Sequence, residues 1–338
     1  QSDVVAALKL LAPTQRSYNK ETHEWPTDLL ALPALLEHLA AFGFHAVSVG
    51  VVQTGGTVER ATITSFGFGV TLFSRNNGTT RNHRLSNLTI RKTWGHAICV
   101  SGGSGCEILG SRISGVNRNA PVTDDCVFGH GIAVDGNAGL NPVRGLVVRN
   151  NSVTDVHGLA RPDCASDPCS KHVRCEAAGF RYRFEGIEVG DSVSGAEISH
   201  NTITNIPFGY GIYYGGGNTA SENALIADNT IAAAFDYGIH VDSRGTGGRT
   251  RNVSIVRNHV TGSSPAGLLL SNTADVRVIS NSFTDSGPLS GVGVAPACVG
   301  CVMQGNAATG AAPRSIWGGK EKTDDKESYL STNERTTT

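Results

Sequence analysis

The side chains of this chain that are best suited to chemistry occupy one position of a short repeated phrase. The phrase is glycine, a branched apolar residue, a variable residue and a second apolar or aromatic residue. Its clear copies begin at Gly131, Gly186, Gly211, Gly238, Gly267 and Gly291. The variable position holds Glu188, Tyr213 and His240 in three successive copies. Because carboxyl, phenol and imidazole groups are common proton donors and acceptors in enzymes, these three are candidate catalytic residues.

Two aspartates lie two residues beyond the variable position, Asp135 in one copy and Asp242 in another. Alternate residues of a strand share a face, so both should face the same way as Glu188. We therefore count Asp135 and Asp242 among the candidate catalytic residues.

The residue just before the glycine forms a third column, with His130, Glu185, Tyr210 and Tyr237 in successive copies. Strict alternation would turn this column to the opposite face, but it lies at the turn that enters the strand, so its direction stays open. We take His130 as a further candidate catalytic residue and Glu185, Tyr210 and Tyr237 as candidate substrate-binding residues.

A second repeat, apolar-x-x-Asn-x-apolar, indicates the element that positions these columns. It places asparagines at Asn151, Asn201, Asn229, Asn258, Asn281 and Asn306, at intervals of 23 to 50 residues. Such intervals suit one turn of a solenoid with loops of variable length, and weaker copies upstream bring the number of coils to about nine. Stacked asparagines can hydrogen-bond to the coil above, so we interpret them as structural. The prediction is an all-β fold, a single parallel β-helix over residues 57–308.

These phrases resemble the right-handed parallel β-helix proteins of the pectin-lyase-like superfamily, including its generic repeat family of carbohydrate-binding and sugar-hydrolase proteins. The resemblance implies right-handed coils and a carbohydrate bound along one face. Parallel β-helix lyases commonly recruit calcium through clustered carboxylates, and Asp135, Glu185, Glu188 and Asp242 could form such an oxygen cage.

The two ends of the chain lack the repeat. Within residues 1–56, the leucine-rich stretch 27–43 predicts a short helix that caps the apolar end of the solenoid. Residues 309–338 are polar and without period, which predicts a loose tail or a strand that wraps the far end.

A long insertion over residues 158–183 carries three cysteines and several basic residues, among them Lys171 and Arg183. We expect a disulfide-stapled basic loop beside the candidate face. Together with Arg244, these cations would bind an anionic polymer such as a polyuronate.

Three functions fit this face. On a uronate polymer, His240 or Tyr213 would act as the base or acid of β-elimination or C5 epimerisation, while a cation stabilises the developing carboxylate charge. Glycoside hydrolysis needs two carboxyl groups about 5 to 9.5 Å apart, which Glu188 with Asp135 or Asp242 could supply. Residues 123–126 (TDDC) and 129–131 (GHG) resemble polygalacturonase motifs, although here both fall on one coil. A non-catalytic solenoid would instead stack sugars on its tyrosines.

Composition limits the partners and the compartment. A net charge of -1 argues against nucleic acid, and no apolar run reaches the roughly 18 residues of a membrane span. Eight cysteines, an even count, favour disulfides and an oxidising compartment. Because the chain begins at Gln1 without an initiator methionine, we expect a processed, secreted protein. Its oligomeric state, monomer or homotrimer, stays open.

Overall fold

The structure is a computed structural model, and it describes the greater part of residues 56–309. The described ranges are 56–64, 69–73, 81–93, 95–116, 129–136, 142–157, 160–161, 180–181, 184–207, 209–216, 219–234, 236–243, 248–264, 266–285, 292–294, 298–309, 317–318 and 331–332. The packing of the chain separates residues 1–48 from residues 49–338, and every described residue belongs to the second unit. The expected helical cap at 27–43 lies outside the described residues.

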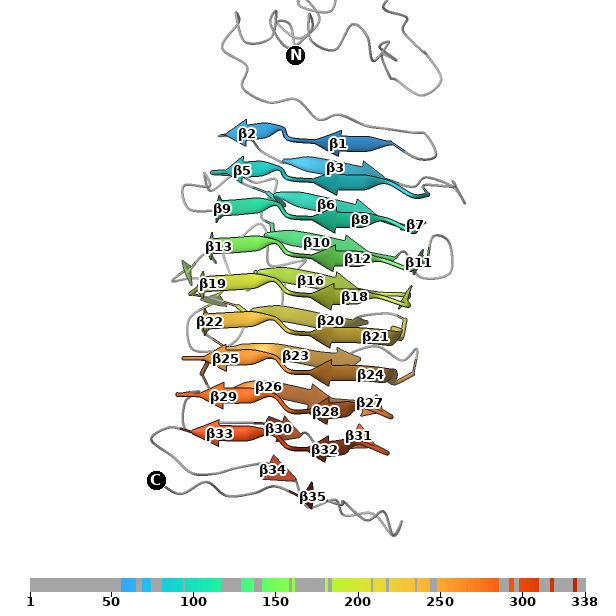
Figure 1. Ribbon diagram of the computed structural model, residues 1–338, viewed down its shortest axis with the longest axis vertical. Coiled ribbons are helices and arrows are strands. Elements are labelled where there is room, and N and C mark those ends of the chain that lie inside the picture. The colour runs from blue at the N-terminus through green and yellow to red at the C-terminus, as the bar shows by residue number, and fades with distance from the viewer. Residues whose placement is uncertain are drawn as a thin grey trace, which may run out of the picture. The chain divides into compact units, whose positions relative to one another are not determined.

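The described chain winds into a parallel β-helix, in which each coil adds one strand to each of three sheets (Figure 1). The first sheet contains β1 (Thr57–Glu59), β4 (Arg84–Ser86), β8 (Glu107–Leu109), β12 (Val147–Arg149), β18 (Glu197–Ser199), β21 (Glu222–Ala227), β24 (Thr250–Val256), β28 (Arg277–Ile279), β32 (Val302–Gln304) and β35 (Ser331–Thr332). Short strands at its edge are β7 (Gly103–Ser104), β11 (Val143–Arg144), β17 (Val193–Ser194), β27 (Thr273–Ala274) and β31 (Cys298–Val299).

The other two sheets contain nine strands each. The second contains β2 (Thr62–Thr64), β5 (Thr89–Arg91), β9 (Arg112–Val116), β13 (Ser152–Val156), β19 (Thr202–Ile206), β22 (Thr230–Ala234), β25 (His259–Thr261), β29 (Ser282–Thr284) and β33 (Ala307–Thr309). The third contains β3 (Val70–Phe73), β6 (Ile98–Ser101), β10 (Ile132–Asp135), β16 (Ile187–Gly190), β20 (Ile212–Gly216), β23 (Tyr237–Ser243), β26 (Ala266–Ser271), β30 (Val292–Val294) and β34 (Trp317–Gly318). The prediction of a parallel β-helix of about nine coils is confirmed.

Two features lie outside these stacks. Within the long insertion, β14 (Ala160–Arg161) pairs antiparallel with β15 (Phe180–Arg181). In the tail, the described strands β34 and β35 continue the third and first sheets. No helix among the described residues is long and apolar enough to cross a membrane.

The core is a stack of branched side chains, one from each coil. In the first sheet, Ile108, Val148, Ile198 and Ile226 lie in register on successive coils, and all are fully buried. Because the strand period is two, the residues on either side of each point outward. This alternation holds the candidate face to the outside.

The asparagine column forms a buried ladder between the first and second sheets. The Oδ1 atom of Asn229 accepts the main-chain N–H of Asn201 at 3.0 Å, and its Nδ2 donates to the Ile198 carbonyl at 2.9 Å. The same pattern links every rung from Asn151 to Asn306. The ladder satisfies turn amides that would otherwise be buried without partners, so the structural interpretation is confirmed.

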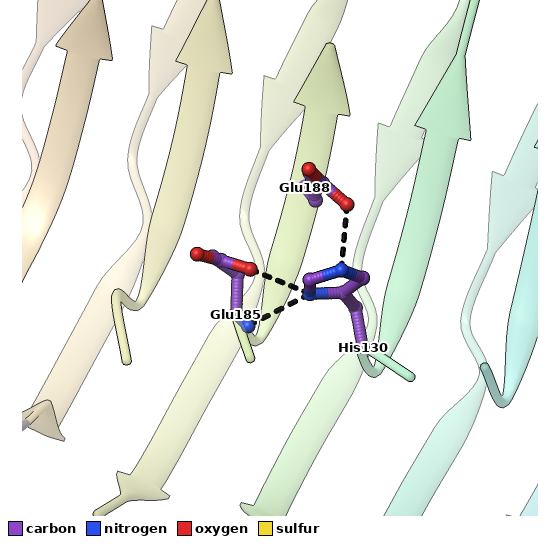
Figure 2. A group of neighbouring side chains, drawn as sticks. All are labelled: His130, Glu185 and Glu188. Carbon is purple, nitrogen blue, oxygen red and sulfur yellow. Dashed lines mark hydrogen bonds and ion pairs between the residues drawn. The ribbon is translucent and has the colours of Figure 1, made fainter. Parts of the chain in front are cut away.

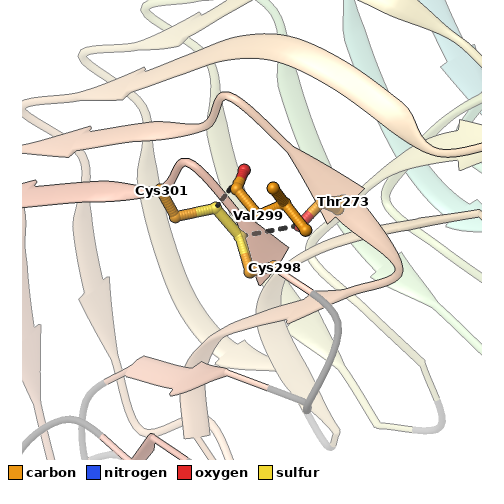
Figure 3. Close-up of a disulfide and its surroundings, with 4 residues drawn as sticks. All are labelled: Thr273, Cys298, Val299 and Cys301. Atoms are coloured by element: carbon orange, nitrogen blue, oxygen red, sulfur yellow. Dashed lines mark hydrogen bonds between the residues drawn. A yellow bond between two sulfur atoms is a disulfide. The ribbon is translucent and has the colours of Figure 1, made fainter. Parts of the chain in front are cut away.

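The described cysteines only partly follow the expectation of disulfides. Cys298 and Cys301 form a disulfide, and the Thr273 hydroxyl lies 2.9 Å from the Cys298 sulfur (Figure 3). Cys99 and Cys106, however, are free, so for these two the prediction is wrong. Cys99 lies on β6 and Cys106 directly precedes β8, and neither is paired with another described cysteine. Which cysteines meet depends on the register of the coils, and the spacing of cysteines in the sequence does not reveal it. The other four cysteines lie outside the described residues.

Candidate functional site

The predicted outward column of the third sheet is present and in register. Glu188 on β16 pairs with Tyr213 on β20, and Tyr213 pairs with His240 on β23. Adjacent strands lie about 4.8 Å apart, so this ladder spans about 10 Å. On its other side, Glu188 pairs with Ala133 of β10.

The column before the glycine, whose direction the sequence left open, lies at the same face. The His130 imidazole contacts the Glu188 carboxylate, and the Tyr210 ring lies 4.8 Å from the His240 ring, centroid to centroid. The turn that enters each strand therefore breaks strict alternation. It brings the first and third columns together into two neighbouring clusters.

The first cluster holds His130 between two glutamates (Figure 2). Its Nδ1 lies 2.5 Å from a Glu185 carboxylate oxygen, and its Nε2 lies 2.8 Å from a Glu188 carboxylate oxygen. The main-chain nitrogen of Glu185 lies 2.9 Å from the same Nδ1. Glu185 is buried, whereas 32% of the Glu188 side chain is exposed. Glu188 is thus the most exposed member of this cluster.

Electrostatics make His130 a cation. Burial lowers the pKa of His130, but the charges of Glu188 and Glu185 and their hydrogen bonds outweigh it and raise the pKa to about 10. The imidazolium donates to one carboxylate at each ring nitrogen, and such charge-assisted bonds are strong. The main-chain N–H of Glu185 also points at Nδ1, but the Glu185 carboxylate lies closer and is charged, so we assign the Nδ1 proton to the carboxylate contact. The cluster therefore carries two carboxylates and one buried positive charge.

The expected calcium cage is not assembled. Asp242 lies on β23, three strands from Asp135 on β10, which is about 14 Å at the usual strand spacing. Calcium holds its oxygen ligands at about 2.3–2.6 Å, so one ion cannot bind both. One ligand atom from each of His130, Glu185 and Glu188 lies within 4.8 Å of the others. These three residues, and not the four predicted carboxylates, are the described group whose ligand atoms lie close enough together to share one ion.

A pocket of about 360 Å³ opens beside this cluster. Its lining comprises His96, Cys99, Ser101, Ala133, Asp135, Glu185, Glu188, Gly190, Asp191 and Tyr213. The described part of this lining is acidic and includes no lysine or arginine. The predicted cations Lys171, Arg183 and Arg244, and the aspartates of the 123–126 motif, lie outside the described residues.

Asp135 stands at the mouth of the pocket in an unusual protonation state. Although Asp135 is an exposed residue, desolvation of its carboxyl in the pocket, with the charges of Asp191 and Glu188, raises its pKa to about 7. A carboxyl with this pKa is largely protonated just below neutral pH. The pocket therefore holds an acid, Asp135, next to a second carboxyl group, Glu188, that forms an ion pair with His130.

The second cluster is a packed group of aromatic rings around His240. Its imidazole contacts Tyr210, Tyr213 and Tyr237, with ring centroids 4.8, 5.5 and 5.6 Å away. Its Nε2 lies 3.3 Å from the Ser271 hydroxyl and 3.9 Å from the Asp242 carboxylate.

Burial changes the roles expected of this cluster. His240, Tyr210 and Tyr213 are 4%, 3% and 6% exposed, and Asp242 is also buried. Rings so covered have no open face for a sugar, so the expected stacking on Tyr210 and Tyr213 is not what the structure shows. Tyr237 is partly exposed, and Tyr213 reaches the neighbouring pocket. We therefore interpret this cluster as packing that supports the wall of the pocket, and not as a second binding site.

Three pocket residues were missed among the candidates from sequence. His96 stands in the same column as His130, and Cys99 stands in the column of Glu188. Their positions in these two columns of the repeat could have identified them from the sequence. Burial, with the charges of Asp135 and Glu188, raises the pKa of Cys99 to about 11, which keeps it a neutral thiol. Asp191 follows β16 at a bend with φ of 42°, and no periodic pattern indicates it.

Three solved structures illustrate what this chain is similar to. The crystal structure of the periplasmic alginate epimerase AlgG matches with a TM-score of 0.51 and 14% identity, covering 78% of this chain and 59% of that one. The Dettilon tailspike protein matches with a TM-score of 0.47 and 14% identity, covering 86% and 62%. PfbA, a surface adhesin of Streptococcus pneumoniae, matches with a TM-score of 0.41 and 10% identity, covering 81% and 87%.

The chain thus spans about three fifths of the length of the epimerase and of the tailspike. At 14% identity, the epimerase match establishes the fold alone. No curated protein matches the sequence significantly. The family described as "Right handed beta helix region" matches residues 130–310, which is more than half of the chain. The chain therefore belongs to this right-handed β-helix family.

Proposed function

We propose that this protein is a carbohydrate-active enzyme that hydrolyses a glycosidic bond of a polysaccharide lying across the third sheet. The observation that carries the proposal is the pair of carboxyl groups in the pocket, Asp135 and Glu188. Their environments push their protonation states apart, and such a pair supplies the acid and the base of glycoside hydrolysis.

The separation of the two groups suits this reaction. Ala133 pairs with Glu188, and Asp135 stands two residues further along the same strand. One strand spacing and two residue rises place their α-carbons about 8 Å apart. Glycosidases hold their two carboxyl groups about 5 to 9.5 Å apart, so both the retaining and the inverting geometry are within reach.

Each group has a role that follows from its surroundings. Asp135, with a pKa raised to about 7, donates a proton to the departing glycosidic oxygen. Glu188, partly exposed and bound to the His130 imidazolium, is the base or the nucleophile. Glu185 is buried, lines the pocket, and holds the His130 ring through its Nδ1. Tyr213 lines the adjoining wall of the pocket.

The test is release of reducing ends from a panel of polygalacturonate, alginate, xylan and mixed-linkage β-glucan, with calcium or with EDTA. Wild-type protein should cleave at least one glycan, and Asp135→Asn and Glu188→Gln should each lower kcat by more than a hundredfold. Glu222→Gln, in the exposed pair with Arg251 on the first sheet, is the matched control and should cleave normally. Silence of the wild type across the panel would refute hydrolysis.

A second candidate is β-elimination or C5 epimerisation of a uronate polymer. His130 favours it, because the imidazolium is a cation beside the pocket that could stabilise the developing carboxylate charge, with Tyr213 as acid or base. The same panel separates the reactions. Elimination creates absorbance near 235 nm, and epimerisation exchanges the C5 proton with solvent without cleavage.

We also infer that the protein works outside the cytoplasm. The Cys298–Cys301 disulfide supports an oxidising compartment, which is where a polysaccharide substrate would be met. Mass spectrometry of protein recovered from the culture medium under alkylating conditions tests this. A reduced pair would contradict the inference.

A further inference from the structure

His96 lies at the pocket, one coil before His130. Its ring is partly exposed and stacks on the His130 ring, with centroids 5.1 Å apart and planes inclined by 18°. His96 is part of the pocket lining, together with Cys99 and Glu188. The acid and base proposed above leave this ring without a role.

A main-chain contact determines which nitrogen of His96 carries a proton. The main-chain N–H of His130 donates to the Nδ1 atom of His96, at 3.0 Å. An imidazole nitrogen that accepts a hydrogen bond carries no proton, so in the neutral ring the proton is on Nε2. The fold therefore selects a single tautomer, whose Nε2–H is the donor of the ring.

The surrounding charges keep this ring neutral. Burial and the positive charge of His130 lower the pKa of His96 to about 3, while the Glu188 charge opposes them in part. A ring that does not gain a proton between pH 5 and 9 is unsuited to acid–base catalysis, which works best near the operating pH. What remains for it is to donate a hydrogen bond.

We propose that His96 is a further substrate-binding residue, whose Nε2–H donates a hydrogen bond to an oxygen of the sugar held in the pocket. This inference rests on the proposed function in one respect, since it takes a glycan as the occupant. It does not depend on which bond is broken, because binding precedes the reaction.

Two variants of His96 test the roles of its two ring nitrogens, Nδ1 and Nε2, separately. Asn at position 96 places an oxygen near the site of Nδ1 and retains the contact with the His130 N–H, but it has no distal donor. Gln reaches the site of Nε2 and retains the donor, but loses the proximal acceptor. His96→Asn should lower kcat/KM about tenfold, the loss expected for one neutral hydrogen bond. His96→Gln should stay within about threefold of the wild type. The opposite order would make His96 a mere support for His130 and would overturn the proposal.

An NMR experiment tests the inference without requiring turnover. In ¹⁵N-histidine-labelled protein, the His96 signals, assigned by their loss in His96→Asn, should show a neutral Nε2–H tautomer from pH 5 to 9. A titration in that range, or the Nδ1–H tautomer, would contradict the proposal. Oligosaccharides of the four panel glycans are then added, and at least one should shift the Nε2–H resonance. If none shifts it, His96 does not contact sugar. If one does while nothing is cleaved, hydrolysis fails but the binding role stands.

Discussion

Replacing His130 by glutamine would leave two acidic side chains behind without their cation. His130 and Glu185 are 13% and 9% exposed at their side chains, so little solvent can screen the loss. Removing one partner of a buried ion pair costs about 3–5 kcal/mol. The pKa shift of His130 from 6.5 to about 10 corresponds to about 5 kcal/mol at 1.36 kcal/mol per pH unit, as an upper bound. We therefore expect His130→Gln to lower the free energy of unfolding by about 3–5 kcal/mol at pH 6.

The sign of the pH dependence follows from the direction of this shift. Because the pKa of His130 is raised in the folded state, its contribution to stability is fully present below pH 6.5 and is lost as the pH rises through about 10. Urea unfolding of the wild type should therefore show the free energy falling between pH 6.5 and 10, and the variant should lack this part of the slope.

The matched control is His259→Gln, at an exposed histidine on β25 whose Nε2 lies 3.3 Å from the Thr261 hydroxyl. It should change the free energy of unfolding by less than about 0.5 kcal/mol. If His130→Gln costs no more than this control, or retains the full slope of the wild type, the imidazolium assignment is wrong.

Three further changes test the site and the fold. Because the pKa of Asp135 is raised in the folded state, its ionisation lowers the free energy of unfolding progressively from pH 3.8 to about 7, and this loss persists above pH 7. Asp135→Asn should therefore raise the free energy of unfolding at pH 8 but not at pH 3. Solvent screening at this exposed residue reduces the gain to on the order of 1 kcal/mol. Asn229→Ala, which removes one residue of the buried ladder, should lower the free energy of unfolding by about 2–4 kcal/mol. The exposed Ser152→Ala, on β13, should stay within about 0.5 kcal/mol, and equal losses would refute the ladder's role. Replacing Cys298 and Cys301 by serine should cost about 2 kcal/mol in urea unfolding, because the closed loop is short, and a cost near zero would show that the bond does not constrain the unfolded chain.

The fold was readable from the sequence because a parallel β-helix repeats two local rules on every coil. Branched residues at every second position identify the inward face, and one asparagine per coil marks the turn. Both rules act within a few residues of the sequence. The positions of Asn201 and Ile198 in the coil can therefore be predicted without knowing which residues of other coils they contact. The outward column of Glu188, Tyr213 and His240 followed by counting.

What the sequence could not decide was which side chains touch. His130 and Glu188 are separated by a long insertion, and their contact depends on a turn that breaks the alternation on which the prediction relied. The burial of His240 depends on three tyrosines packed around it, which the spacing of the repeat does not encode.

The sequence by itself thus determined the coil, the ladder and the face, because these arise from period and from local turn chemistry. Only the tertiary structure decided the chemistry of the pocket, because protonation depends on burial and on charges that different coils bring together. Asp135 illustrates the difference. The repeat in the sequence predicts its position on the strand, whereas its raised pKa results from desolvation in the pocket and from the charges of Asp191 and Glu188 on the next coil.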